Sequence, residues 1–294
     1  MSGISAADPY PRKRVKVGGA EMAYVETGRG DPIVLLHGNP TNSYLWRNVI
    51  PHLEGLGRCL APDLMNSGGS GNIPGGGLRY QDHIPYLDAW FEGVGAAKDA
   101  VFVLHDWGGA LGFNRLCRFP EQVRGVAYIE AMVRPRFWSD MPEDRVAQFK
   151  KLRGPEGRKM VMETNFFIET MLFDRGIIRE LSEEEKAAYR KPAEDPQKRQ
   201  QTHQWACEIP FEGEPADNFA LVKRYSDFLC ASADLPKLFV NCEEGHALAG
   251  AAREFCRKWP NQTEVSLPAR HYVQEDYPHE LGEAVAAFIR RVRG

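Results

Sequence analysis

One acidic residue, Asp106, follows soon after an apolar run in the stretch Val101–Gly112 (VFVLHDWGGALG). The stretch predicts a buried strand that turns sharply into a helix with a small-residue start, a local structure that exposes a nucleophile at a sheet edge. Asp106 stands where a serine is usual, and Gly108 and Gly109 permit a close approach of the helix to the strand. An Asp before a helix is often only an N-cap, so the turn by itself leaves both roles open.

A carboxylate nucleophile selects a different reaction from a serine. A serine must lose a proton before it attacks, whereas a carboxylate is already anionic at neutral pH. Attack by a carboxylate on an acyl carbon would give a reactive anhydride, but attack on a saturated carbon bearing a leaving group gives an ordinary ester. Asp106 therefore predicts alkyl transfer from a carbon–halogen or epoxide substrate, followed by hydrolysis of the ester.

A general base for that hydrolysis is expected late in the chain, after the last strand and before the final helix. Of the eight histidines, His271 occupies this position, in the loop LPARHYVQED. His279 falls in the following helix and His246 in the preceding connection. His37 and His105 flank the ends of predicted strands, where we expect them to orient the backbone. His271 is therefore the predicted base.

The imidazole needs a carboxylate that holds it in the correct tautomer. Glu130 directly follows the apolar run GVAYI, the next predicted strand after the one that carries Asp106. Glu243 and Glu244 follow a later strand and are the alternatives. We favour Glu130, because it ends an apolar strand and so points to the site, whereas the adjoining glutamates are typical of a solvated turn.

Apolar strands that alternate with helical segments must position these side chains. The predicted strands are Glu21–Glu26, Pro32–Leu36, Arg58–Pro62, Ala100–Leu104, Gly125–Ile129, Lys237–Asn241 and Thr263–Leu267. Helical patterns include Tyr80–Val94, Ala110–Arg118 and Gly250–Lys258. This alternation predicts an α/β fold with a mostly parallel central sheet flanked by helices on both faces.

The segment from about Val133 to Pro215 breaks the alternation, because it contains amphipathic pieces and a charge-rich stretch but no convincing strand. We expect an inserted helical cap over the carboxyl edge of the sheet, where open α/β sheets bind ligands. The predicted organisation is a core from residues 1–132, a cap from 133–215 and the rest of the core from 216–294. The loop Ser67–Gly77 lacks the Lys-Ser/Thr ending of a phosphate loop, and we interpret it as a surface turn.

Composition excludes several other classes of function. The chain has 37 Lys plus Arg against 40 Asp plus Glu, and no basic tract clusters with aromatic residues, so nucleic acid is not an expected partner. Its six cysteines show neither a CxxC pair nor a metal-ligand spacing, which predicts reduced thiols and no metal. The polar segment Met1–Lys16 lacks the apolar run of a signal peptide, and no stretch reaches membrane-spanning length. We expect a cytoplasmic protein without a membrane partner.

Taken together, these motifs resemble the haloalkane dehalogenases of the α/β-hydrolase superfamily, in the branch with an Asp–His–Glu triad that includes the lindane-pathway enzyme. The resemblance rests on DPIVLLHGNPTNSYLW at 31–46, HDWGGALGF, YIEAMVRP and HYVQED, and it extends to NFFIETML and FCRKWPNQTE. HDWG alone is not specific, because related epoxide hydrolases share it. The combination is specific, and it spans nearly the whole chain.

The resemblance implies roles for five residues. Asp106 would be the nucleophile, His271 the base and Glu130 its partner, while the side-chain N–H groups of Asn39 and Trp107 would bind the departing halide. Donors without a full positive charge suit a halide that must later leave. Trp107 has an alternative role as a core aromatic residue. The backbone N–H groups of Asn39 and Trp107 would form the oxyanion hole, and no cofactor is expected.

A halogenated alkane and a halide ion are the implied small-molecule partners, and we expect a monomer or a weak homodimer. The residues expected to line the substrate pocket are Met141, Phe149, Phe167, Pro210, Ala247 and Tyr272. Some segments depart from the pattern of relatives: residues 64–77, an extra residue in 173–176, and His246-Ala247 in place of a bulkier pair. These departures bear on substrate range and on the width of the entrance.

Other functions remain as alternatives. An epoxide hydrolase needs an acid, typically paired cap tyrosines, and between Val133 and Pro215 only Tyr189 is present. A coelenterazine luciferase shares the same triad and cap pattern. A receptor on a hydrolase fold would keep the pocket and bind without turnover, although every group needed for catalysis is present here.

Overall fold

The computed structural model describes residues 3–294, apart from the side chain of Asp144. An eight-stranded sheet forms its centre, with the strand order β1-β2-β4-β3-β5-β6-β7-β8. β1 and β2 pair antiparallel, as do β2 and β4, and all later pairs are parallel. The strands are β1 Arg12–Val17, β2 Ala20–Thr27, β3 Pro32–Leu36, β4 Arg58–Pro62, β5 Ala100–His105, β6 Val123–Ile129, β7 Lys237–Cys242 and β8 Gln262–Leu267.

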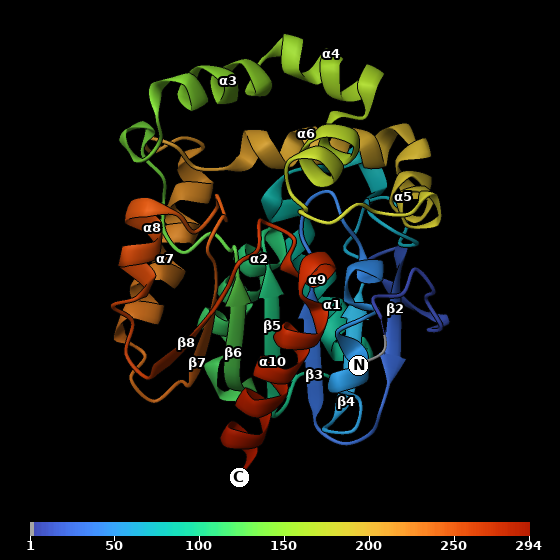
Figure 1. Ribbon diagram of the computed structural model, residues 1–294, viewed down its shortest axis with the longest axis vertical. Coiled ribbons are helices and arrows are strands. Elements are labelled where there is room, and N and C mark those ends of the chain that lie inside the picture. The colour runs from blue at the N-terminus through green and yellow to red at the C-terminus, as the bar shows by residue number, and fades with distance from the viewer. Residues whose placement is uncertain (1–2) are drawn as a thin grey trace.

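Helices cover both faces of the sheet and its carboxyl edge (Figure 1). The α-helices are α1 Tyr80–Gly93, α2 Trp107–Arg118, α3 Glu143–Arg153, α4 Pro155–Thr164, α5 Glu183–Arg190, α6 Pro196–Glu208, α7 Ala216–Ala231, α8 Gly250–Cys256, α9 Val273–Asp276 and α10 Pro278–Arg293. Phe167–Asp174 is a π-helix, and the short 3₁₀ turns are Ser43–Trp46, Ile50–His52, Pro74–Gly76, Pro120–Gln122, Trp138–Asp140 and Lys191–Glu194. The predicted α/β-hydrolase architecture is therefore confirmed. No described helix is both long and apolar enough to cross a bilayer.

Alternate residues of each central strand enter two separate apolar cores, because successive side chains point to opposite faces of a sheet. In β5, Phe102 and Leu104 belong to the core beneath α1, α2 and α7, whereas Val101 and Val103 belong to the core beneath α10. All four side chains are essentially inaccessible to water. A strand buried on both faces explains why its sequence is continuously apolar.

β1 was not predicted from the sequence, where its residues fall in or next to the polar segment Met1–Lys16. Arg12–Val17 (RKRVKV) is an edge strand that pairs with β2, and its basic side chains are mostly exposed while Val17 is buried. Charged residues are common on edge strands, because they discourage pairing with other chains. Met1 and Ser2 lie outside the described residues.

The loop 67–77 is not simply a surface turn, which corrects the sequence interpretation. Ser70 and Ile73 are buried. The Ser70 hydroxyl donates to the Asp63 carbonyl and accepts from the Ala23 backbone N–H. Just before the loop, the Asn66 side chain donates to Gln201 of α6. The loop thus connects the edge of the sheet to the helices above it.

Helices α3 to α6 lie over the carboxyl ends of the parallel strands, with α3 and α4 outermost (Figure 1). α6 packs against both α3 and α4, and Leu152, Val161 and Ala206 form a small apolar core between them. These helices all fall within residues 133–215. They close the edge of the sheet at which β3, β5 and β6 end.

A buried ion network fixes α5 to the rest of the fold. The Arg47 guanidinium contacts Glu185 of α5 at 2.7 Å and Glu275 of α9 at 2.6 Å. Arg179 reaches the same two carboxylates, and the Tyr189 hydroxyl donates to Glu275. Two cations therefore balance two anions in a site that is almost closed to water.

Candidate active site

Asp106 occupies the turn between β5 and α2 in a strained backbone conformation, with φ at 50° and ψ at −121°. Its side chain makes no capping hydrogen bond to α2, so the N-cap interpretation does not account for it. A Cβ atom on Gly108 would lie 2.4 Å from the His37 carbonyl, and one on Gly38 would lie 2.2 Å from an Asp106 oxygen. Positive φ at a non-glycine residue costs about 1–3 kcal/mol and is concentrated at functional sites.

His271 lies in the loop between β8 and α9, and it connects two carboxylates. Its Nδ1 is 3.0 Å from a Glu130 oxygen, and its Nε2 is 3.6 Å from Asp106 Oδ2. Burial alone would lower the pKa of His271, but the hydrogen bonds and charges of Asp106 and Glu130 raise it to about 9. Burial would likewise raise the pKa of Asp106, and the interaction with His271 lowers it.

Glu130 directly follows β6, is buried, and adopts a positive φ of 47°. Besides His271, its carboxylate accepts the backbone N–H groups of His246 and Ala247 at 2.8 Å and of Leu248 at 3.0 Å. Burial alone would raise the pKa of Glu130, yet His271 and these donors hold it at about 2. Glu130 is thus an anion that both orients the imidazole and anchors the loop after β7.

The competing glutamates lie away from this centre. Glu243 and Glu244 are both exposed, and Glu244 forms a surface ion pair with Arg270 at 3.5 Å. Their backbone N–H groups donate to the carbonyls of Leu267, the last residue of β8, and of Ala269. The structure therefore brings Glu130, and neither of these residues, to His271.

The other histidines considered from the sequence have different partners, and two of them, His105 and His37, bond to backbone groups. His105 donates through Nε2 to the His271 carbonyl at 2.9 Å, and burial lowers its pKa to about 3. His37 accepts the Leu64 backbone N–H at 2.9 Å. His246 stacks on the ring of His271 with centroids 4.5 Å apart, and burial lowers its pKa to about 4. His279, on α10, contacts His52 instead.

Asn39 is hydrogen-bonded to Asp106. Its backbone N–H donates to Asp106 Oδ1 at 2.7 Å, and its side-chain amide donates to the Thr202 carbonyl of α6 at 3.0 Å. Tyr272, one of the predicted pocket residues, donates its hydroxyl to the Asn39 carbonyl at 2.9 Å. The amide has a second N–H, so the bond to Thr202 orients the group without using both donors.

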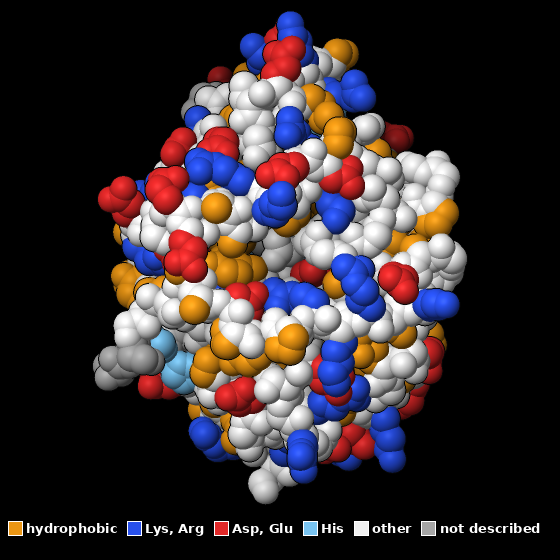
Figure 2. All heavy atoms as spheres, turned by 90° about the vertical axis from the view of Figure 1, so that its right-hand side faces the viewer, with side chains coloured by type: hydrophobic (Ala, Val, Ile, Leu, Met, Phe, Trp, Pro, Cys, Tyr) orange, Lys and Arg blue, Asp and Glu red, His pale blue; other side chains and the backbone are white. Residues whose placement is uncertain are grey.

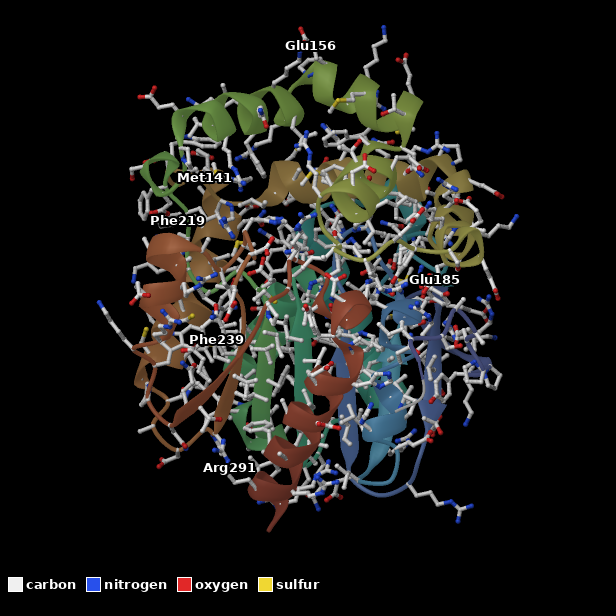
Figure 3. The ribbon with its side chains drawn as sticks, in the orientation of Figure 1. Met141, Glu156, Glu185, Phe219, Phe239 and Arg291 are labelled. Carbon is white, nitrogen blue, oxygen red and sulfur yellow. The ribbon has the colours of Figure 1, made fainter. Side chains whose placement is uncertain are left out.

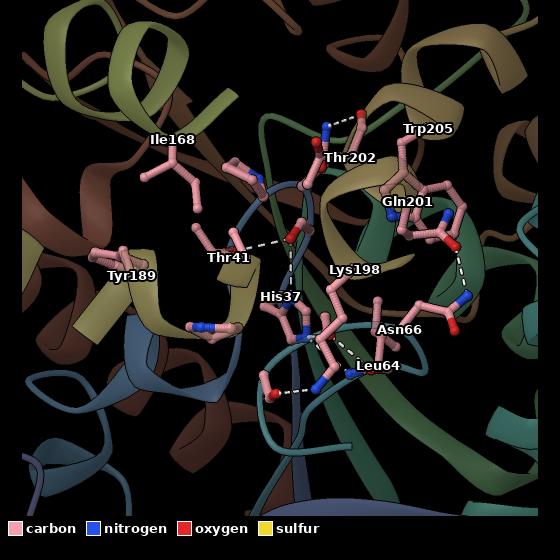
Figure 4. A pocket seen from close by; sticks show the side chains of 17 residues that line it. His37, Thr41, Leu64, Asn66, Ile168, Tyr189, Lys198, Gln201, Thr202 and Trp205 are labelled. Atoms are coloured by element: carbon pink, nitrogen blue, oxygen red, sulfur yellow. Dashed lines mark hydrogen bonds between the residues drawn. The ribbon is translucent and has the colours of Figure 1, made fainter. Parts of the chain in front are cut away.

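Asn39 belongs to a larger interface between the sheet edge and α6, drawn in Figure 4. Here Asn66 donates to Gln201, and Lys198 donates to the Gly68 carbonyl. Thr202 and Trp205 of α6 lie on the same side of this interface (Figure 4). The position of Asn39 therefore depends on α6 as well as on β3.

Trp107 is buried at the start of α2, and its indole ring stacks on Trp205 with centroids 4.4 Å apart. It also contacts Tyr80 at 5.5 Å. Trp205 was not predicted as a site residue, because nothing in the pattern of α6 distinguishes this tryptophan from an ordinary core residue. The stacking fixes the plane of the Trp107 indole and hence the direction of its N–H group.

A cavity of about 30 Å³ adjoins Asp106. It is lined by Asp106, Trp107, Glu130, Met132, Arg136, Ile209 and Ala247. A neighbouring cavity of about 90 Å³ shares Arg136 and Ala247 with it and also contains Met141 and His246. Met141 lies below α3 at the edge of the cap (Figure 3). Of the predicted pocket residues, Ala247 and Met141 thus lie at these cavities.

Three other predicted pocket residues pack differently. Phe149 contacts Phe211 within the cap, at 5.4 Å between centroids. Phe167 belongs to the apolar core between the cap helices. Pro210 is buried, and its carbonyl accepts the Arg136 backbone N–H at 3.1 Å. The structure does not place these three among the described residues that line the two cavities; Ile209, next to Pro210, lines the smaller one.

Three side chains with metal-ligand atoms meet in the site. Glu130, His246 and His271 place these atoms within 4.8 Å of one another. However, both Glu130 oxygens already accept hydrogen bonds, and the two imidazoles are stacked at 21°. The nitrogen lone pairs of stacked rings lie in two nearly parallel planes and so do not converge on one point as a tetrahedral metal site requires. The arrangement fits an oriented base better than a metal centre.

The turn between β5 and α2 has the form of the strand-to-helix elbow of α/β-hydrolases, with an aspartate where serine is usual. A histidine and a buried carboxylate complete the set, which is that of a hydrolase-fold protein with an acid in place of serine. Residues 33–284 match the family described as "Alpha/beta hydrolase family". The chain belongs to this family and, within it, to the haloalkane dehalogenases. A haloalkane dehalogenase from Sphingobium indicum is 45% identical over 98% of both chains.

Two further relatives are informative. The crystal structure of the haloalkane dehalogenase DbeA from Bradyrhizobium elkani superposes with a TM-score of 0.90 at 38% identity, covering 96% of this chain and 98% of that one. A coelenterazine h 2-monooxygenase from Renilla reniformis is 39% identical over 88% of this chain and 84% of its own. The same fold therefore carries more than one activity among relatives of similar identity.

Proposed function

We propose that this protein hydrolyses the carbon–halogen bond of haloalkanes through an alkyl ester on Asp106. The observation that carries the proposal is the series of contacts from Asp106 through His271 to Glu130. A carboxylate nucleophile faces an imidazole, and the other ring nitrogen of that imidazole contacts a buried carboxylate. The membership in the haloalkane dehalogenases gives the substrate class.

In the first step, an oxygen of Asp106 attacks the halogen-bearing carbon. The carbon–halogen bond breaks, the halide leaves with the bonding electrons, and an ester forms. Oδ1 already accepts the Asn39 N–H, so the freer Oδ2 is the proposed nucleophile. The Trp107 indole and the second N–H of the Asn39 amide are the proposed halide donors, because both are neutral and oriented by α6.

In the second step, His271 takes a proton from water, and the hydroxide attacks the ester carbonyl carbon. The negative charge then develops on Oδ1, which the Asn39 N–H already faces. Collapse releases the alcohol and restores the carboxylate, so that substrate and water give alcohol, halide and a proton. In the free protein, the negative charge of Asp106 helps to hold the pKa of His271 at about 9. Formation of the ester removes this charge and so lowers the pKa of His271. The base thus becomes easier to deprotonate at the step that needs it.

An epoxide hydrolase is less well supported. Opening an epoxide requires an acid for its oxygen, yet none of the described residues that line the smaller cavity is a tyrosine. The Tyr189 hydroxyl already donates a hydrogen bond to Glu275, and the Tyr272 hydroxyl donates one to the Asn39 carbonyl. A monooxygenase activity is supported by the similarity to the Renilla enzyme. However, such a reaction needs oxygen, whereas the triad explains hydrolysis with water alone as the second reactant.

A halide-release assay tests the proposal. The purified protein should release bromide or iodide from short terminal haloalkanes, and addition of a chelator should leave the rate unchanged. A parallel assay with matched epoxides should show much slower turnover. A protein that bound these substrates without releasing halide would be a receptor, and a metal requirement or a preference for the epoxide would also contradict the proposal.

A further inference from the structure

Arg136 places a positive charge beside the reaction centre. It follows β6 by a few residues, is partly buried, and lines the same cavity as Asp106 and Trp107. Its backbone N–H donates to the Pro210 carbonyl, and its Nη2 donates to the Ala247 carbonyl at 2.7 Å. These two bonds hold the residue from both sides, so its position in the cavity wall is built into the fold.

The neighbouring cavity of about 90 Å³ is markedly basic. Its ionisable lining comprises Arg134, Arg136, Arg145, Asp140 and His246. Arg134 pairs with Asp140 at 2.9 Å, which balances one of the three arginines. Burial lowers the pKa of His246 to about 4, so this ring adds no charge at neutral pH. The lining therefore carries two more positive than negative charges.

Arg136 keeps donor groups for a ligand. Among the described residues, its side chain hydrogen-bonds only to the Ala247 carbonyl, and no carboxylate forms an ion pair with it. Glu130 is nearby but already accepts bonds from His271 and the 246–248 backbone. Burial lowers the pKa of Arg136 from its ordinary value, although the charges of Glu130, Asp106 and Asp140 act in the opposite direction. An anion in the basic cavity would form the direct ion pair that these carboxylates do not make with Arg136.

We propose that Arg136 binds the carboxylate of halogenated carboxylic acids whose halogen-bearing carbon reaches Asp106. The inference rests on the proposed dehalogenation and specifies its substrate class. Arg136 and Ala247 line both cavities, and the proposed substrate would place its halogen end beside Asp106 in the smaller cavity and its carboxylate against Arg136. A planar guanidinium matches a carboxylate with two parallel hydrogen bonds.

The experiment compares two substrates that differ only in charge, 6-bromohexanoate and 6-bromohexanamide. The wild-type protein should have the higher kcat/KM for the carboxylate. Arg136→Met should lower the carboxylate-to-amide ratio of kcat/KM by about tenfold to a hundredfold, the range expected for a hydrogen bond to a charged group. Arg136→Lys keeps the charge but not the planar pair of donors, and its carboxylate-to-amide ratio should lie between those of the wild type and Arg136→Met.

Arg158→Met is the matched control, because Arg158 is exposed on α4 and lines neither cavity. It should leave the ratio unchanged. Should Arg136→Met fail to fold, inhibition of the wild type still decides the matter: hexanoate should compete with 6-bromohexanamide more strongly than hexanamide does.

Three outcomes would overturn the inference. The wild type could process the amide at least as well as the carboxylate, or Arg136→Met could lower both rates equally. Arg136→Met could also relieve inhibition by added bromide without changing the ratio, which would make Arg136 a binder of product halide only. Absence of halide release from both substrates and from neutral haloalkanes would instead contradict the proposed function itself.

Discussion

His271 is the residue on which the proposed reaction turns. Two carboxylates flank its ring, and together they raise its pKa to about 9. In the free protein the imidazole is therefore largely protonated near neutral pH, a state that the first step tolerates because Asp106 attacks without a base. Formation of the ester removes one of the two anions. The same geometry thus suits a nucleophilic step first and a basic step second.

Glu130 provides a test of the triad at the level of one residue. Glu130→Gln should lower kcat by about 10³–10⁴-fold, because a mispositioned imidazole cannot activate water. Glu243→Gln is the matched control, since Glu243 is exposed, and its rate should stay near that of the wild type. Thermal unfolding should be recorded for both, because Glu130 also anchors the 246–248 backbone. If Glu243→Gln were the more damaging change, the acid would lie after β7.

The sequence located some site residues and missed others for a physical reason. Asp106, Glu130 and His271 each follow a strand, and the ends of parallel strands meet at one edge of the sheet. Trp205 and Arg136 reach the site from a cap helix and from a loop, whose placement depends on tertiary packing. Arg136 did leave a signal, a charged residue soon after an apolar strand end in VRPRFW.

At the level of elements, the apolar strands were predictable, because burial on both faces leaves a continuous apolar run. β3 and β4 have the predicted bounds, and β5 to β8 differ from them by two residues or fewer at either end. β1 was missed, since an exposed edge strand carries the polar residues that are also typical of a loop. The burial of Ser70 and Ile73 was missed because the partners of the 67–77 loop, β2 and α6, are distant in sequence.

The attachment of α5 offers a second prediction. Glu185→Gln should lower the free energy of unfolding by about 3 kcal/mol, because it leaves Arg47 and Arg179 facing Glu275 alone in a buried site. Glu184→Gln, an exposed neighbour on the same helix, should change it little. Chemical denaturation of both variants gives the comparison.

The loss of unfolding free energy in Glu185→Gln should also depend on pH. Burial would raise the pKa of Glu185, but Arg179 and the Ser182 backbone N–H hold it at about 2. A carboxyl with a depressed pKa stabilises the fold above its unfolded pKa of about 4.3, and that contribution disappears as the pH falls towards 2. The difference between wild type and Glu185→Gln should therefore shrink over this interval. A difference that stayed constant would mean that the Glu185 charge is not what stabilises α5.

At the level of the whole molecule, the sheet carries the proposed reacting groups near the carboxyl ends of its strands, and helices α3 to α6 lie over that edge. Figure 2 shows Lys and Arg side chains interspersed with Asp and Glu on the face drawn there, without a broad field of one sign. The positive charge beside Arg136 comes from the arginines that line the cavity of about 90 Å³. Substrate selection is expected to reside at this cavity, where Arg136, Met141 and Ala247 meet.

The most direct test of the account is a single-turnover experiment with His271→Phe. The first step needs only Asp106, so this variant should release about one equivalent of halide from a bromoalkane and then stop. Intact-protein mass spectrometry should show one added alkyl group, peptide mapping should place it on Asp106, and Asp106→Ala should show neither halide burst nor adduct. Normal turnover by His271→Phe, or an adduct on a cysteine such as Cys242, would contradict the covalent carboxylate mechanism.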